Sequence, residues 1–230
     1  MHVQQLACTQ RSYTNGSPCS VIAAFAGLAF LQAAPDDPPI RRLEHRLRMG
    51  CTAWAILVSP PRGRHTPSDA LTVNEVLSSV VDTDTGAAPW VHHLEMVGLH
   101  VPASHAAAAA AMLATLGTPA AGVIEFMTVA SMRAALREAE RRATTTRHSL
   151  AATVTYAGHT VVVAFVVNDF GHCASALDSL SGQWLIGDGA DAINTLVDHV
   201  TTVWFPPTEV VDAALFTANV FSCAAAPPAV

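Results

Sequence analysis

The chain of 230 residues contains no lysine, and all twelve of its basic side chains are arginine. Against 18 acidic residues this leaves a formal net charge of −6. No basic surplus is available to neutralise phosphates, so the composition argues against nucleic acid as a partner. The segment Gly187-Asp188-Gly189 is not followed by the lysine or threonine of a phosphate-binding loop. A GC-rich coding sequence, which also favours alanine, is the simplest explanation for the missing lysine.

Paired cysteines are absent too, because no Cys-x-x-Cys occurs in the chain. The cysteines are Cys8, Cys19, Cys51, Cys173 and Cys223. Their odd number and scattered positions exclude a zinc-finger arrangement and fit a reducing compartment.

A group of histidines is formed by His92, His93, His100 and His105. Their spacing matches no standard metal site, so we expect neither a metal nor another cofactor.

Long apolar segments are also missing. The longest, residues 19–35, is shorter than a membrane span and ends at Pro35-Asp36-Asp37. The beginning of the chain shows no basic region followed by a long apolar run, so we expect no secretory signal. With 51% hydrophobic and 13% charged residues, the composition predicts a globular protein without a membrane partner, in the cytoplasm or nucleus.

The segment around Cys19 has the features of a helix start. Asn15-Gly16 is a turn signal, Ser17 is a suitable N-cap, and Pro18 suits the first helical position. Cys19 then falls in the first turn, where unpaired N–H groups and the helix dipole favour a thiolate. Residues 21–31 carry no polar side chain, which predicts a helix buried on all sides. This is the layout of a cysteine nucleophile, although an inert buried cysteine is the alternative.

A hairpin downstream supplies a possible base and acid. Residues 161–167 are rich in β-branched side chains, and residues 168–171, Asn-Asp-Phe-Gly, are a turn signal before a second strand at about 172–177. In this hairpin the numbers of two paired residues should add up to about 339. His159 would then lie opposite residue 180, within two positions of Asp178. A carboxylate there can hold the imidazole tautomer and stabilise the imidazolium. Separately, each residue could simply cap a strand or open a turn.

His172 is the rival base. It lies on the same predicted strand as Asp178, six residues earlier, and so about 20 Å away at roughly 3.3 Å per residue. No hydrogen bond can form over that distance, which favours His159.

Residues 15–24, Asn-Gly-Ser-Pro-Cys-Ser-Val-Ile-Ala-Ala, resemble the Gly-Pro-Cys-x-Val-Ile-Ala nucleophile segment of the MINDY deubiquitinases, with Ser17 as an extra residue. In that family a glutamine before the cysteine serves the oxyanion hole, and the resemblance implies this role for Gln10. The order of His159 and Asp178 also matches. Asn15, which has the same amide chemistry, is the rival oxyanion donor.

The herpesvirus tegument deubiquitinases are also similar, since they begin with a glutamine and then a cysteine on a buried helix, before a β-rich second half. Their acid and histidine lie together as Asp-Pro-His, whereas Asp178 is followed by Ser-Leu. This difference favours the separated arrangement of His159 and Asp178.

These resemblances imply an α+β, papain-like cysteine protease fold, with a helical N-terminal half whose buried nucleophile helix packs on a C-terminal antiparallel sheet. We expect a single catalytic domain over residues 1–223, with a helical lobe to about 120, a β-rich lobe from about 121, and a disordered tail at 224–230. The implied activity is thiol-dependent hydrolysis of ubiquitin or ubiquitin-like conjugates, without a cofactor. The implied site residues are Cys19 as nucleophile, His159 as base, Asp178 as orienting acid and Gln10 as oxyanion donor.

The resemblances imply ubiquitin or ubiquitin chains as the partner. They also add the virion tegument to the expected locations of the protein. A protein without lysine also cannot accept ubiquitin on a lysine side chain, which suits this partner but does not prove it. The loop acids Asp36, Asp37, Asp82 and Asp84 could face the arginine-rich ubiquitin tail. Three alternatives stay open: a papain-like protease or amidase acting on another peptide, a catalytically inactive module that binds ubiquitin or another protein, and a tegument-type scaffold.

The remaining pattern predicts further elements. Helices are expected at 41–58 (with a break near Gly50 as an open alternative), 70–80, 102–116 (with Ser104 as the alternative start), 129–143, 190–199 and 209–217. Strands are expected at 123–127, from 150, and at 201–205, with a linker at 144–147.

Overall fold

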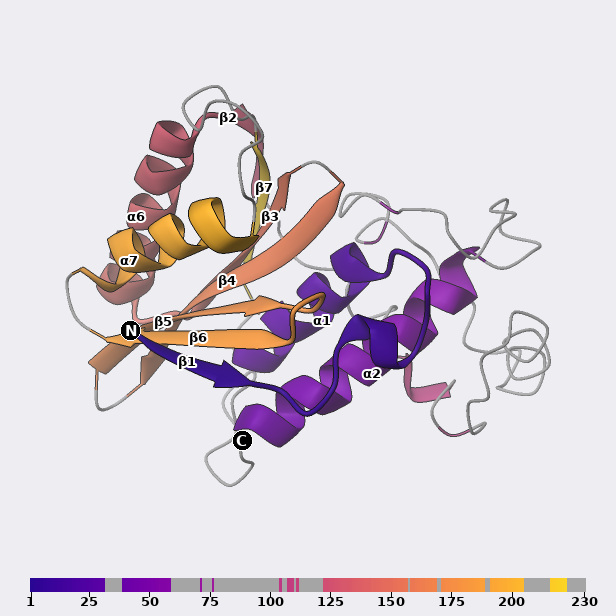
Figure 1. Cartoon of the computed structure of the whole chain (residues 1–230). Helices are drawn as coiled ribbons and strands as arrows, with labels where there is room; N and C mark the ends of the chain where they lie inside the picture. Colours follow the sequence, from indigo (N-terminus) through magenta and orange to yellow (C-terminus); the bar gives the residue numbers. More distant parts are fainter. Residues whose placement is uncertain are drawn as a thin grey trace.

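The computed structural model describes residues 1–31, 39–58, 71, 76, 104, 107–109, 111, 122–156, 158–168, 171–188, 191–204 and 216–222. One antiparallel sheet has helices on both faces, α1 and α2 on one and α6 and α7 on the other (Figure 1). The expected α+β class is therefore confirmed. Most of the helices expected at 70–80 and 102–116, the four clustered histidines, the four loop acids and the tail lie outside the described residues.

The sheet has seven strands in the order β1-β6-β5-β4-β3-β7-β2. Their bounds are β1 His2–Gln5, β2 Gly122–Met127, β3 Leu150–Tyr156, β4 His159–Asn168, β5 Gly171–Asp178, β6 Gln183–Asp188 and β7 Phe216–Ser222. Every neighbouring pair is antiparallel.

The β4–β5 hairpin has the register expected from the sequence. Asn168 pairs with Gly171 and Val162 pairs with Leu177, so the paired numbers sum to 339. The β-branched side chains of β4 are buried on both faces of the sheet, which holds this register. As a result, the first residue of β4 and the last residue of β5 lie at the same end of the hairpin.

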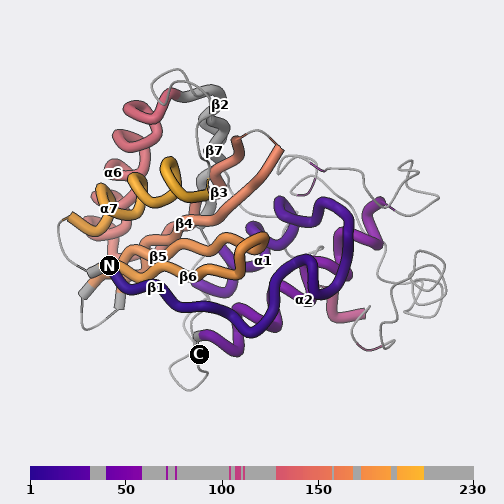
Figure 2. The backbone as a smooth tube through the Cα atoms, in the orientation of Figure 1, coloured from indigo at the N-terminus to yellow at the C-terminus, as the bar shows by residue number. Residues whose placement is uncertain are grey.

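The sequence did not predict β1, which brings the beginning of the chain to the edge of the sheet beside β6 (Figure 2). Its four residues are mostly polar and exposed, so they lack the apolar alternation that identifies a strand. The expected helical lobe thus contributes a strand to the sheet, and the residues after β1 lie against the turn between β5 and β6.

Helices α1 (Cys19–Leu31) and α2 (Pro39–Val58) pack against each other on one face of the sheet. All of α1 up to Phe30 is buried, as expected from the absence of polar side chains at residues 21–31. The alternative prediction of a break near Gly50 is wrong, because α2 is continuous. A Cβ at Gly50 would lie 2.7 Å from Cγ1 and 2.8 Å from Cα of Ile22, so the glycine allows the two helices to approach closely.

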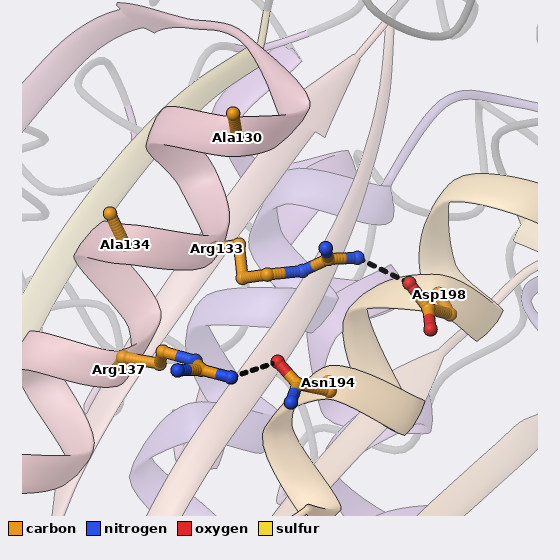
Figure 3. A pocket seen from close by; sticks show the side chains of 6 residues that line it. All are labelled: Ala130, Arg133, Ala134, Arg137, Asn194 and Asp198. Atoms are coloured by element: carbon orange, nitrogen blue, oxygen red, sulfur yellow. Dashed lines mark hydrogen bonds and ion pairs between the residues drawn. The ribbon is translucent and has the colours of Figure 1, made fainter.

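Helices α6 (Val129–Thr146) and α7 (Ala192–His199) cover the other face. They are joined by an ion pair between Arg133 and Asp198 and by a 2.6 Å hydrogen bond from Arg137 to Asn194 (Figure 3). The linker expected at 144–147 is wrong for its first three residues, because α6 continues to Thr146 and ends with Arg147 in the left-handed conformation.

The strand expected at 201–205 is also wrong. Val200–Trp204 forms a π-helical turn, η2, directly after α7. The Thr201 and Thr202 hydroxyls donate to the carbonyls of Val197 and Asp198, which favours continuation of the helix over the strand that β-branched residues suggest. The last two residues of the helix expected at 209–217 belong instead to β7.

No helix within the described part of the chain is long and apolar enough to cross a membrane.

Candidate active site

Cys19 is the first residue of α1. The amide N–H of Ile22 donates to the carbonyl of Pro18 at 2.9 Å, so Pro18 immediately precedes the helix, one position earlier than expected. The Cys19 N–H, as a first-turn amide, has no intrahelical acceptor. Its thiol is buried and lies 3.8 Å from the carbonyl oxygen of Gly158, directly before β4. Packing of α1 against the sheet therefore places the thiol next to His159.

The imidazole of His159 lies between the thiol and a carboxylate. His159 Nε2 is 2.8 Å from Asp178 Oδ1, and the two side chains are only 18% and 5% exposed. The imidazole is also close enough to Cys19 to lower the pKa of the thiol, and the thiol in turn raises the pKa of His159. Because Nε2 is engaged by Asp178, Nδ1 is the nitrogen left for the thiol. The structure thus connects the three predicted residues in the order thiol, imidazole, carboxylate.

Asp178 is held by the tight turn that follows β5. Its Oδ1 accepts from the Leu180 N–H at 2.8 Å and its Oδ2 from the Ser181 N–H at 3.2 Å. Its carbonyl accepts from the N–H of Gly182, whose φ of +70° suits glycine. These bonds fix the carboxylate and keep it charged.

The electrostatics favour a charged thiol and imidazole. Burial raises the pKa of Cys19, but the His159 imidazole and the N–H and hydroxyl of Thr160 lower it more, so its net pKa is below the usual value. Burial lowers the pKa of His159, yet hydrogen bonds and charges of Asp178 and Cys19 raise it to about 9. Burial likewise raises the pKa of Asp178, while His159 and the turn lower it below its usual value. These shifts favour the charged forms of the thiol and the imidazole over their neutral forms.

Gln10 is buried in the short 3₁₀ helix η1, Gln10–Ser12. Its backbone N–H donates to the Ser179 carbonyl, and its side-chain Oε1 accepts from the Ser179 hydroxyl, both at 2.9 Å. The β5–β6 turn therefore links Gln10 to the residue after Asp178. The rival donor Asn15 is exposed, and its backbone carbonyl accepts from the Arg11 guanidinium at 2.8 Å, as expected for a turn residue.

His172 lies at the opposite end of β5 from Asp178. Its Nε2 is 3.3 Å from Glu140 of α6, so this imidazole faces a different carboxylate. The structure thus places Asp178 against His159 and not against His172. Among the described residues, no group of three His, Cys, Asp or Glu side chains could hold a metal ion.

Two residues around these side chains were not predicted. The N–H and hydroxyl of Thr160 lower the pKa of Cys19, and this hydroxyl is 2.9 Å from that of Thr155 on the neighbouring strand. Ser179 contacts Gln10. Each directly follows a predicted residue, but a lone hydroxyl carries no pattern that identifies it from sequence.

No protein-family model and no curated protein matches the chain. Among solved structures it is similar to the ubiquitin-specific protease encoded by the murine cytomegalovirus tegument protein M48, which was crystallised in complex with a ubiquitin-based suicide substrate. The TM-score is 0.50 at 15% identity, over 97% of this chain and 88% of that chain. A second match, the Pseudomonas avirulence protein AvrPphB, has a TM-score of 0.38 at 11% identity, over 94% of this chain and 100% of that chain.

The second similarity is too low to support an argument, and the first shows the fold. The chain thus has the expected α+β, papain-like fold, which it shares with the murine cytomegalovirus tegument protease. The resemblance to the MINDY family stays a prediction.

Proposed function

We propose that the protein is a cysteine protease that cleaves ubiquitin conjugates. The observation that carries this proposal is the buried chain of contacts from the Cys19 thiol through the His159 imidazole to Asp178, at the start of a buried helix. A charged thiol and imidazole at rest is the activated state of a cysteine nucleophile.

In the proposed reaction, the Cys19 thiolate attacks the carbonyl carbon of the scissile bond. The negative charge that develops on the carbonyl oxygen is stabilised by the Cys19 N–H and the side-chain amide of Gln10. The imidazolium gives its proton to the leaving amine, the C–N bond breaks, and a thioester remains on Cys19. A water molecule, deprotonated by His159, then attacks the thioester carbonyl; the C–S bond breaks, the acid product leaves, and the Cys19 thiolate and His159 imidazolium are restored.

Asp178 acts through His159. Its carboxylate keeps the Nε2 proton in place and stabilises the positive imidazole that the resting enzyme requires. The bonds from the Leu180 and Ser181 amides leave the carboxylate little freedom to turn away.

Ubiquitin as the substrate is supported by the shared fold with a viral ubiquitin-specific protease and by the motif around Cys19. The lysine-free composition is compatible with this substrate, since the enzyme offers no lysine side chain as an acceptor.

The test uses ubiquitin that carries an electrophile at its C-terminus. Incubation should add the mass of one ubiquitin to the protein, and peptide mapping should place it on Cys19. Cys19→Ala should abolish labelling, whereas the control Cys51→Ala should label normally, because Cys51 is buried in the core and burial raises its pKa to about 12.

Other outcomes select the alternatives. Tight binding without labelling would indicate an inactive binding module. Neither binding nor labelling would exclude ubiquitin and leave a protease on another peptide or a scaffold. A parallel series of ubiquitin-like probes tests whether ubiquitin itself is preferred.

A further inference from the structure

The turn between β5 and β6, residues 179–182, contacts two parts of the candidate site at once. Through the amides of Leu180 and Ser181 it binds the Asp178 carboxylate. Through Ser179 it binds Gln10, by one backbone and one side-chain hydrogen bond, each 2.9 Å long. Residues 169 positions apart in the chain are thereby joined.

The same turn also holds the segment that leads to Gln10. The Leu6 N–H donates to the Gly182 carbonyl at 2.8 Å, and the Gln5 side chain donates to the Ser181 carbonyl at 2.7 Å. A Cβ at Gly182 would lie 3.1 Å from the Cys8 carbonyl oxygen, so the turn and this segment are in close contact. These contacts hold the backbone that leads to Gln10 in place independently of the Gln10 side chain.

We infer that Ser179 is a positioning residue that orients the Gln10 side chain for oxyanion stabilisation, an inference that rests on the proposed function. A glutamine amide has a donor end and an acceptor end, and only the donor end can stabilise an oxyanion. The Ser179 hydroxyl donates to Oε1 and so engages the acceptor end. The NH₂ group is then left for the reacting carbonyl.

Burial makes this orientation matter. Ser179 is 2% exposed and Gln10 is 3% exposed, so water cannot readily replace the lost hydroxyl. Without it, the amide can rotate and place its carbonyl oxygen toward the developing negative charge. Ser179→Ala should therefore lower the rate of the chemical step and leave ubiquitin binding unchanged.

The experiment is a double-mutant cycle on hydrolysis of a ubiquitin fluorogenic substrate. Gln10→Ala should lower kcat by about 10²–10³, typical of a lost oxyanion donor. Ser179→Ala should lower kcat by about tenfold at constant KM, as for one misdirected neutral hydrogen bond. In the Gln10→Ala background, Ser179→Ala should cause no further loss. An equal additional loss in that background would overturn the inference, because the effect would not pass through Gln10.

Ser175→Ala is the matched control. This buried serine, on β5 four residues before Ser179, donates to the Leu185 carbonyl at 3.1 Å and accepts from the Trp184 indole at 2.6 Å. It should lower the melting temperature and leave kcat unchanged. A kcat loss like that of Ser179→Ala would show that any buried hydroxyl in this part of the sheet matters equally, which contradicts a specific role for Ser179.

Gln10→Glu keeps the inference testable if Ser179→Ala does not fold. Glutamate retains an acceptor for the Ser179 hydroxyl but has no NH₂ group, so it should lose kcat like Gln10→Ala and keep more of the thermal stability. Equal loss of stability in both variants would show that the hydroxyl–carbonyl contact does not hold the side chain.

These stability measurements do not need activity. If the wild-type protein neither hydrolyses ubiquitin nor reacts with the probe, the proposed function is wrong. Coupling between Gln10 and Ser179 in the melting temperatures would then still establish the contact, so the two failures are distinguishable.

Discussion

Replacing Asp178 by asparagine removes the negative charge of the side chain but keeps its shape, so the variant tests the role of the charge. Asp178 Oδ1 accepts from both His159 Nε2 and the Leu180 N–H, whereas Oδ2 accepts from the Ser181 N–H. An asparagine should therefore place its oxygen at the Oδ1 position and its NH₂ group against Ser181. This orientation preserves the His159 tautomer, at the cost of one donor–donor contact, and removes the negative charge.

The size of the effect follows from the pKa of His159. The rise from 6.5 to about 9 corresponds to about 3 kcal/mol in favour of the imidazolium. Asp178 and Cys19 share this stabilisation, and the hydrogen bond with Asp178 is the largest of the contributions that raise the pKa. Loss of the charge should therefore cost about 1.5–3 kcal/mol, or roughly 10–100-fold in kcat/KM at neutral pH.

The assay is kcat/KM for a ubiquitin fluorogenic substrate as a function of pH. In the wild type, activity should fall as pH rises through about 9, where His159 loses its proton. In Asp178→Asn the pKa of His159 is lower, so the alkaline limb should move to lower pH.

Asp198→Asn is the control with the same charge change, since Asp198 pairs with Arg133 between α6 and α7. An unchanged alkaline limb in Asp178→Asn, in a protein that melts normally, would refute the assignment of Asp178. A shift of equal size in Asp198→Asn would attribute the effect to net charge alone.

The other predictions concern reactivity, the choice of base and packing. Iodoacetamide near neutral pH should modify Cys19 before Cys51, because burial raises the pKa of Cys51 to about 12. Mass spectrometry that shows the reverse order would contradict the assignment of Cys19 as the reactive thiolate. His159→Ala should lower kcat by several orders of magnitude while His172→Ala changes it little; the opposite result would place the base at the other end of β5. Gly50→Ala should lower the melting temperature, because the added methyl would lie 2.7 Å from the facing helix, and an unchanged melting curve would show that α1 and α2 can separate at little cost.

Local signals in the sequence were enough to predict the elements that carry the site. The turn and proline before Cys19, and the absence of polar side chains after it, predict a buried helix that starts at the thiol. The β-branched run of β4 and the turn after it predict the register of the hairpin to within a residue or two, and the observed pairs sum to 339. Both patterns work because they arise from contacts between residues near each other in the chain.

Where the sequence predictions failed, the deciding contacts were distant or the local signal was ambiguous. Gly50 suggests a break because glycine destabilises an isolated helix, yet its lack of a side chain is what allows α2 to contact Ile22 of α1. Thr201 and Thr202 suggest a strand by propensity, but their hydroxyls bind carbonyls of the preceding helix. β1 has no apolar pattern and exists through its pairing with β6.

The candidate site divides in the same way. The sequence by itself determined that a thiol begins a buried helix and that an imidazole and a carboxylate meet across a hairpin, because helix capping and strand register are local. Only the tertiary structure decided that the thiol contacts this imidazole, and that Gln10 is held by Ser179, since residues so far apart in the chain approach only when the sheet packs on α1 and β1 joins its edge. Burial in that packed state also sets the electrostatics, because hydrogen bonds and charges shift pKa values strongly only where water is excluded.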